Sequence, residues 1–141
     1  MAATIRPAAG TDAARTAAIA EAAYRPYLSR MGRRPAPMDD DYARRIAGDL
    51  TFVLVEDGEI CGFMVLEAHS DHLLLDNIAV DPARHGRGHG RHLLDFVEAE
   101  ARRRGCAAVE LFTNAVMIEN IALYRRRGYV ETGRRRDRGY D

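Results

Sequence analysis

Leu73-Leu74-Leu75-Asp76-Asn77-Ile78-Ala79-Val80-Asp81-Pro82-Ala83-Arg84-His85-Gly86-Arg87-Gly88-His89-Gly90-Arg91-His92-Leu93-Leu94 is the stretch that decides the fold. An apolar run predicts a strand that Pro82 ends, and a helical pattern begins after the glycine loop. Glycine adopts positive φ without steric cost, so glycines at every second position let the main chain fold closely around a ligand. The helix that follows presents unpaired N–H groups and the positive end of its dipole there. The stretch therefore predicts strand, anion-binding loop and helix, suited to a phosphate or pyrophosphate.

The composition excludes several classes of protein. The chain has 141 residues, 47% hydrophobic and 30% charged, with a formal net charge of zero, so we expect one globular domain with no overall field that attracts nucleic acid or membrane. All 21 basic residues are arginine, which suits carboxylate or phosphate partners, although a compositional bias of the genome is the simpler cause. Cys61 and Cys106 stand far apart, outside any metal-ligand spacing, and predict free thiols in a reducing compartment.

No targeting or membrane segment is expected. No apolar run approaches the roughly 20 residues that span a bilayer, and the N-terminus lacks the apolar core of a signal peptide. The sequence therefore predicts a cytoplasmic protein.

The first half of the chain predicts a strand, helices and a hairpin. A short strand at 4–6 precedes a helix capped by Thr11 or Asp12, and the acidic triplet 39–41 caps a short helix from Tyr42 to Ala47 that Gly48 ends. The runs 51–55 and 60–66 are rich in β-formers, and Asp57-Gly58 between them is a strong hairpin signal. With the strand 73–80 they form an antiparallel meander.

The second half predicts a crossover. The helix after Gly90 places Leu93, Leu94, Val97 and Ala101 on one apolar stripe, and Gly105 ends it. The strand 107–113 follows this crossover helix, so it lies parallel to the strand 73–80. A helix from about 117 to 127 and a last strand at 129–132 complete the chain.

Two common phosphate-binding motifs do not fit the glycine loop. A G-x-x-x-x-G-K-[ST] loop needs a lysine, which this chain lacks, and the dinucleotide motif G-x-G-x-x-G needs its third glycine where Arg91 stands. The meander, the loop 84–90 and the later segment Asn120-Ile121-Ala122-Leu123-Tyr124 together resemble instead the GNAT superfamily of acyl-CoA-dependent N-acyltransferases. The resemblance covers roughly residues 51–132.

The resemblance implies a fold and a cofactor site. The fold is a mixed α/β (α+β) arrangement in which a mostly antiparallel central sheet, flanked by helices, splays into a V between its two central parallel strands. Acetyl-CoA, as co-substrate, would place its pyrophosphate on the loop, where His85 replaces the usual glutamine or arginine. Its pantetheine arm would bind main-chain groups of Ile78 and Val80 like an added strand. The implied cofactor residues are Ile78, Val80, His85, Gly86, Arg87, Gly88, His89, Gly90, Arg91 and Asn120; no metal is expected.

Two other residues are the candidates for the proton transfers of the reaction. Asn120 and Tyr124 stand one helical turn apart, at the spacing at which the family places an asparagine near the pantetheine and a tyrosine near the sulfur. Tyr124 is the candidate general acid for the departing thiolate. Alternation along the strand places Leu74, Asp76, Ile78 and Val80 on one face. Asp76 is then the candidate base for the amine, or it forms an ion pair with an arginine, in which case Glu67, His69 or His72 relays protons through water.

The whole chain, residues 1–141, is thus predicted to be a single N-acetyltransferase domain that moves an acetyl group to a primary amine by direct attack in a ternary complex. A homodimer is common in the family. Two other classes stay open: a non-catalytic acyl-CoA-binding regulatory protein of the same fold, and an arginine-rich nucleic-acid-binding module, which the neutral total charge disfavours. The sequence does not identify the acceptor amine.

Overall fold

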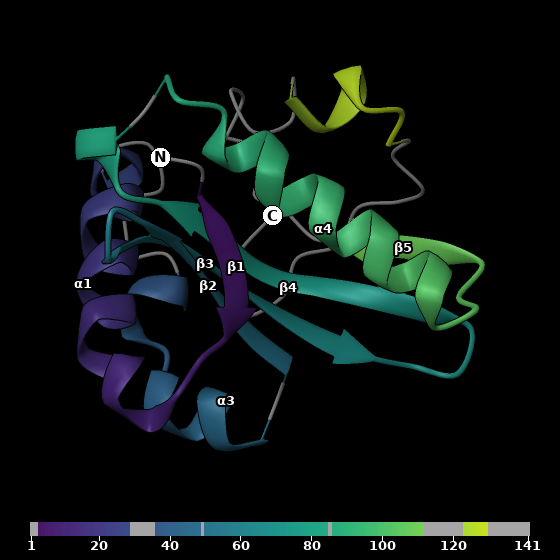
Figure 1. The fold of residues 1–141 in the computed structure, drawn as a ribbon, viewed down its shortest axis with the longest axis horizontal. Coiled ribbons are helices and arrows are strands. Elements are labelled where there is room, and N and C mark those ends of the chain that lie inside the picture. Colours follow the sequence, from purple (N-terminus) through teal and green to yellow (C-terminus); the bar gives the residue numbers. More distant parts are fainter. Residues whose placement is uncertain (1–2, 29–35, 49, 85, 112–122, 130–141) are drawn as a thin grey trace.

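Five strands form one mixed sheet in the computed structural model, which describes residues 3–28, 36–48, 50–84, 86–111 and 123–129 (Figure 1). The strands lie in the order β1-β2-β3-β4-β5. Their bounds are β1 Thr4–Pro7, β2 Leu50–Glu56, β3 Glu59–Ala68, β4 His72–Val80 and β5 Ala108–Leu111. Neighbours pair antiparallel except β4 and β5, which are parallel. This confirms the predicted mixed, mostly antiparallel sheet with a parallel pair after the crossover.

The β2–β3 hairpin turns where the sequence predicts it. Asp57 and Gly58 both have positive φ, 54° and 78°, as a tight two-residue hairpin turn requires. Glu56 and Glu59 pair directly across this turn. The turn therefore fixes two carboxylates side by side at the end of the hairpin.

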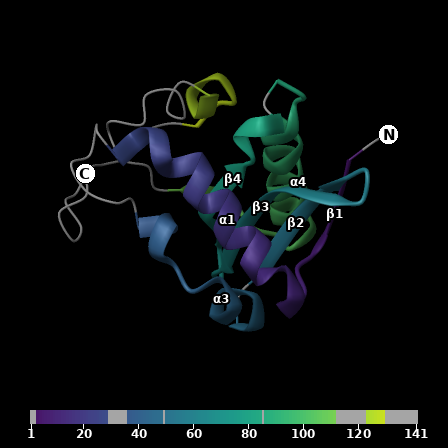
Figure 2. The same cartoon turned by 90° about the vertical axis from the view of Figure 1, so that its left-hand side faces the viewer.

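Helices cover both faces of the sheet. Figure 2 shows α1 (Ala13–Tyr24) and α4 (His89–Arg103) on opposite sides of the strands. The shorter α3 (Tyr42–Gly48) lies below the sheet in Figure 1, and its first turn is capped by Asp41, whose side chain accepts a hydrogen bond from the N–H of Arg44. The predicted capping of this helix by the acidic triplet is thus confirmed at Asp41. Short 3-10 helices complete the described chain at Gly10–Asp12, Arg25–Tyr27, Ala36–Asp39 and Pro82–Arg84.

Each face has its own apolar core. The predicted stripe of α4, Leu93, Leu94, Val97 and Ala101, is buried against one face of the sheet. Ile19 and Ala20 of α1 are fully buried against the other face, together with Phe63 of β3. Burial of such side chains contributes roughly 1.5–3 kcal/mol each, so the two cores hold β3 and β4 firmly between the helices.

A β-bulge interrupts β4 at Asp76. Val65 of β3 pairs with Asn77 and Leu66 pairs with Leu75, which leaves Asp76 as an extra residue. Before the bulge Leu73 and Leu75 belong to the α4 core; after it Ile78 and Val80 pack against that core. The expectation that Leu74, Asp76, Ile78 and Val80 share one face is therefore wrong, because one extra residue reverses the alternation.

The parallel pair is short. β5 pairs only with His72–Leu75, so the half of β4 beyond Asp76 has a strand partner on one side only, within the described ranges. Residues 123–126 are helical and Gly128, with φ 92°, follows them. Residues 117–122 of the predicted helix, residues 112 and 113 of the predicted strand and residues 130–132 of the last strand lie outside the described residues.

No helix in the described part of the chain is long and apolar enough to cross a membrane.

Candidate active site

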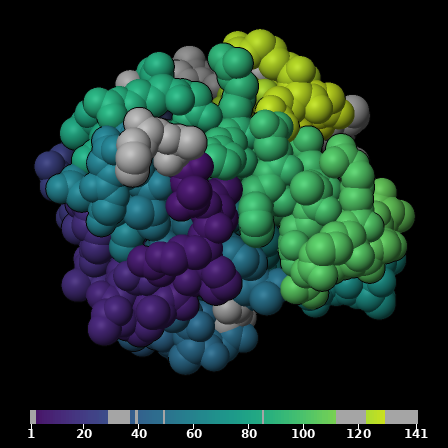
Figure 3. Space-filling view, viewed as in Figure 1, coloured from purple at the N-terminus to yellow at the C-terminus, as the bar shows by residue number. Residues whose placement is uncertain are grey.

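One cavity lies between the glycine loop and the half of β4 that follows Asp76. We call this part of the strand, residues 77–80, the free half of β4, because among the described residues it pairs only with β3. The cavity, about 290 Å³ in volume, is bounded by β4, by the loop, by the first turns of α4 and by residues 123 and 124. In Figure 3 residues 123–129 (yellow) lie at the surface beside the green and teal residues of α4 and its preceding loop. The predicted site residues along this cavity are Ile78, Val80, Gly86, Gly88, His89, Gly90, Arg91 and Tyr124. The structure thus brings together most of the residues that the sequence singles out, with Tyr124 beside strand residues more than 40 positions earlier in the chain.

The loop presents main chain to the cavity. Gly86 and Gly88 have φ of 82° and 77°, whereas Gly90 lies within α4, which begins at His89 rather than after Gly90 as predicted. An added Cβ at any of the three would meet no atom within 4 Å. These glycines therefore leave open space above the N-terminal amides of a 15-residue helix, which is an arrangement suited to an anion.

Three predicted cofactor residues are not among those that line the cavity. The Arg87 guanidinium does not line the cavity; it donates a hydrogen bond of 2.6 Å to Glu56 of β2. His85 and Asn120 lie outside the described residues. The positive charge at the cavity comes instead from Arg84 and Arg91.

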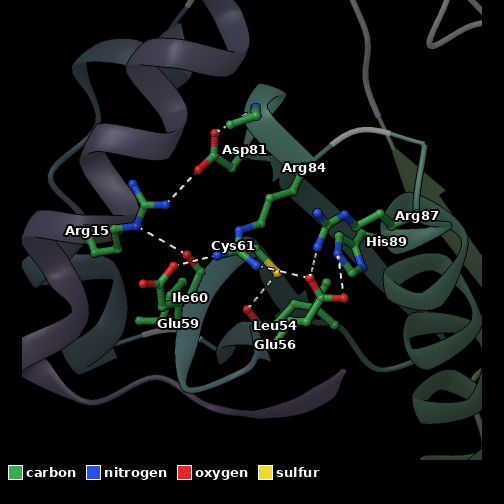
Figure 4. Close-up of polar contacts among 11 residues, drawn as sticks. Arg15, Leu54, Glu56, Glu59, Ile60, Cys61, Asp81, Arg84, Arg87 and His89 are labelled. Atoms are coloured by element: carbon green, nitrogen blue, oxygen red, sulfur yellow. Dashed lines mark hydrogen bonds and ion pairs between the residues drawn. The ribbon is translucent and has the colours of Figure 1, made fainter. Parts of the chain in front are cut away.

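Glu56 is a site residue that the sequence did not reveal. Its Oε1 accepts hydrogen bonds from Arg84 (3.0 Å) and Arg87 (2.6 Å), and its Oε2 lies 3.6 Å from Nε2 of His89 (Figure 4). The hydrogen bond from Arg87, with that from Arg84, holds the pKa of Glu56 below its usual range. We call Glu56, Arg84, Arg87 and His89 the Glu56 cluster. Glu56 lies 28 positions before Arg84 and 31 before Arg87, and the fold of the sheet brings it to them.

Tyr124 lies at the other end of the cavity. Its side chain is nearly buried, and burial raises its pKa to about 12. Its ring packs edge-on against Tyr129, with ring centroids 5.9 Å apart. The phenol therefore keeps its proton at neutral pH.

Tyr24 connects α1 to the free half of β4. Its hydroxyl lies 3.0 Å from both the carbonyl oxygen of Ile78 and Oδ1 of Asn77, so its single proton is shared between two acceptors. Asn77 in turn donates to the hydroxyl of Tyr42, which donates to the carbonyl of Pro37. Burial raises the pKa of Tyr24 well above its ordinary value. This network fixes the strand immediately after the bulge.

Asp76 lies in an ion-pair network away from the cavity. Its carboxylate accepts a hydrogen bond from Arg45 of α3, whose guanidinium also lies 3.5 Å from Asp40 and 3.8 Å from Glu67. The Arg45 side chain is 12% exposed. The ion pair that the sequence offered as an alternative to a base is therefore present, and Asp76 is not among the residues that line the cavity.

The histidines proposed for a relay lie at the far end of the β3–β4 hairpin. His69 and His72 stack with ring centroids 4.5 Å apart, and His69 lies 3.9 Å from Glu67. Among the described residues no group of three or more histidine, cysteine or acidic side chains is placed to hold a metal ion.

Comparison with known proteins decides the family. The profile of the acetyltransferase (GNAT) family matches residues 16–129. The chain belongs to the GNAT acetyltransferase family. The match includes the meander, the glycine loop, α4 and Tyr124.

Individual relatives of this GNAT chain carry acetyltransferase names. The [Ribosomal protein bS18]-alanine N-acetyltransferase of Escherichia coli (strain K12) is 36% identical over 88 residues, which are 62% of this chain and 60% of the relative. The crystal structure of the ribosomal-protein-S18-alanine N-acetyltransferase from Escherichia coli superposes with a TM-score of 0.73 at 29% identity and covers 96% of this chain and 83% of that chain. The PaiA N-acetyltransferase from Thermoplasma acidophilum, in complex with coenzyme A, gives 0.84 at 17% identity, with 95% and 94% covered, and shows the shared fold.

Proposed function

We propose that this chain is an N-acetyltransferase that moves an acetyl group from acetyl-CoA to a primary amine by direct attack in a ternary complex. The observation that supports this most is the single cavity in which the free half of β4, the glycine loop and Tyr124 meet. The family and the names of the relatives agree with it. We further propose that residues 1–141 act as one domain, since both apolar cores are built on the same sheet.

The chain's residues fit coenzyme A by their chemistry. The open main-chain cradle at Gly86 and Gly88 suits a pyrophosphate, and Arg91 adds positive charge beside it, whereas the guanidinium of Arg84 at the same cavity is already paired with Glu56 and Glu59. The strand edge at Ile78 and Val80 offers main-chain groups to an extended arm, as an added strand would use them. The Ile78 carbonyl already accepts from Tyr24, yet a carbonyl oxygen has a second lone pair. His85 and Asn120 are assigned to the same site from the sequence.

Acetyl-CoA supplies the acyl group as a thioester. Tyr124 holds a proton on its hydroxyl and would donate it to the sulfur as negative charge develops there. The attacking amine loses one proton when the amide forms. We assign that proton to water rather than directly to Asp76, since the Asp76 carboxylate already accepts a hydrogen bond from Arg45.

The acceptor is proposed to be the α-amine of an alanine at a peptide or protein N-terminus, by analogy with the name of the Escherichia coli relative. The proposed compartment is the cytoplasm, which the free thiols of Cys61 and Cys106 fit.

A two-step experiment tests the function. The purified chain is first titrated with coenzyme A by calorimetry, and then incubated with acetyl-CoA and a panel of amines: alanyl peptides, free amino acids, polyamines and aminoglycosides. Release of free thiol that depends on an amine confirms transfer, and the panel identifies the acceptor. Binding of coenzyme A without thiol release on any amine favours the regulatory alternative, and absence of binding overturns the cofactor site.

A further inference from the structure

The Glu56 cluster lies directly beneath the loop that would hold the pyrophosphate. Glu56 is the last residue of β2, whereas the three basic groups come from the short helix before the loop, from the loop itself and from the first residue of α4. Figure 4 shows Arg84, Arg87 and His89 directed toward the same carboxylate. A single acidic side chain thus contacts the loop at its beginning, middle and end.

These contacts bracket the two left-handed glycines. Gly86 lies between Arg84 and Arg87, and Gly88 lies between Arg87 and His89. Glycine loses more conformational freedom than any other residue when it is ordered. Contacts that fix the residues on either side of each glycine therefore reduce the freedom that binding must otherwise remove.

The burial of the cluster favours a persistent contact. The side chains of Glu56 and His89 are 12% and 4% exposed, and no described residue lies within hydrogen-bond distance of the buried Nε2 of His89. When Nε2 carries the ring proton, a carboxylate in front of it attracts it. Glu56 is the acidic group that faces it, at 3.6 Å.

Electrostatics alone predicts that Glu56 weakens the binding of an anion. A carboxylate beside a pyrophosphate repels it, and Glu56 additionally occupies Arg87, which does not line the cavity. On electrostatic grounds the loss of this carboxylate should strengthen anion binding. A geometric role for Glu56 predicts weaker binding, so the sign of the effect distinguishes the two.

We propose that Glu56 is a positioning residue that holds the glycine loop in its coenzyme A-binding conformation through Arg84, Arg87 and His89, an inference that rests on the proposed function. Glu56 is not among the residues that line the cavity. It acts on the affinity for the cofactor and leaves the chemical step to Tyr124.

The chain offers a matched control. Glu59 pairs with Glu56 across the hairpin, carries the same charge and also bonds Arg84, but it is 69% exposed and is not among the contacts of Arg87 or His89. Glu56→Gln and Glu59→Gln therefore remove equal charge from nearly the same place. Only the first releases Arg87 and His89.

Calorimetric titration with coenzyme A tests the proposal without an acceptor. We expect Glu56→Gln to bind coenzyme A about tenfold more weakly, as loss of a charged hydrogen bond implies, whereas Glu59→Gln binds as the parent does. With the acceptor that the amine panel identifies, KM for acetyl-CoA rises by a similar factor and kcat stays within about twofold. Glu56→Asp keeps the charge but shortens the reach, and we expect intermediate affinity from it.

Each other outcome is decisive. Equal or tighter binding by Glu56→Gln, or an equal loss in both glutamine variants, overturns the positioning role. If thermal melting shows that Glu56→Gln is unfolded, the Glu56→Asp titration decides, and parental affinity there overturns it as well. Failure of the parent chain to bind coenzyme A overturns the proposed function instead, so the two failures are distinguishable.

Discussion

The Tyr24 hydroxyl lies 3.0 Å from the carbonyl oxygen of Ile78 and donates to it across the edge of β4. This bond joins α1 to the strand segment that has no β5 neighbour among the described residues. It forms part of the same buried network as Asn77 and Tyr42.

Tyr24→Phe removes the donor from the buried Oδ1 of Asn77 and from the part-buried carbonyl of Ile78. We expect the free energy of unfolding to fall by about 1–3 kcal/mol, measured by urea denaturation. The hydroxyl of Tyr42 bonds the same asparagine. The losses in unfolding free energy caused by Tyr24→Phe and Tyr42→Phe should therefore be less than additive in a double-mutant cycle. Additive effects of the two variants would show that Asn77 does not couple them.

Tyr124→Phe tests the proton donor. We expect kcat to fall by about a hundredfold, in the range of a lost general acid, while the affinity for coenzyme A measured by calorimetry changes little. Tyr129→Phe is the control, because its ring contacts Tyr124 but is not among the residues that line the cavity. Parental turnover in Tyr124→Phe would exclude this phenol from the chemistry.

Gly88→Asp tests the loop. Gly88 and Gly105 both have left-handed backbone, with φ of 77° and 72°, and both face open space, but only Gly88 lines the cavity. We expect Gly88→Asp to weaken coenzyme A binding more than tenfold, since it adds bulk and negative charge at the anion cradle. Gly105→Asp should lower the melting temperature comparably and leave binding intact; equal affinities in the two variants would contradict the assigned loop.

Asp76→Asn distinguishes an ion pair from a base. Because Asp76 bonds Arg45, which Asp40 and Glu67 also approach, we expect a loss of roughly 1 kcal/mol in stability and a kcat within about tenfold of the parent. A loss of a hundredfold or more in kcat, with the melting temperature unchanged, would instead identify Asp76 as the base.

Alkaline pH should unfold the protein through its buried tyrosines. The pKa of Tyr124 is raised from 10.0 to about 12, so the folded state holds this proton more tightly than the unfolded chain does. The resulting stability is complete below pH 10 and is lost as pH rises toward 12. The change in phenolate absorbance should therefore coincide with loss of circular dichroism; ionisation of all tyrosines near pH 10 in a folded protein would contradict it.

Most of the fold could be predicted from the sequence, because the signals for turns and helix faces lie within short stretches of the chain. Asp57-Gly58 specifies its own hairpin, and the spacing of Leu93, Leu94 and Val97 specifies which face of α4 is buried. The bulge at Asp76 was not predictable in this way. It arises from the pairing of β3 with β4, and neither strand's sequence alone contains a signal for it.

The site was only partly predictable for the same reason. Gly86 and Gly88 can be predicted as loop residues from their residue type, and Tyr124 can be predicted as a site residue from the resemblance to the family. Glu56 and Tyr24 carry no motif: one becomes relevant through the hairpin register and the other through the packing of α1 on β4. Their contacts are long-range in the chain, and three-dimensional packing alone creates them.

Arginine provides every basic side chain other than histidine, including Arg45, Arg84 and Arg87 in the ion pairs described above. A guanidinium stays protonated at any pH at which the protein is folded, so it has no free lone pair with which to attack a thioester. A deprotonated lysine amine, by contrast, is a nucleophile that an acyl thioester can modify. The chain therefore pairs its carboxylates with positive charge while none of its side chains offers an amine for acetylation.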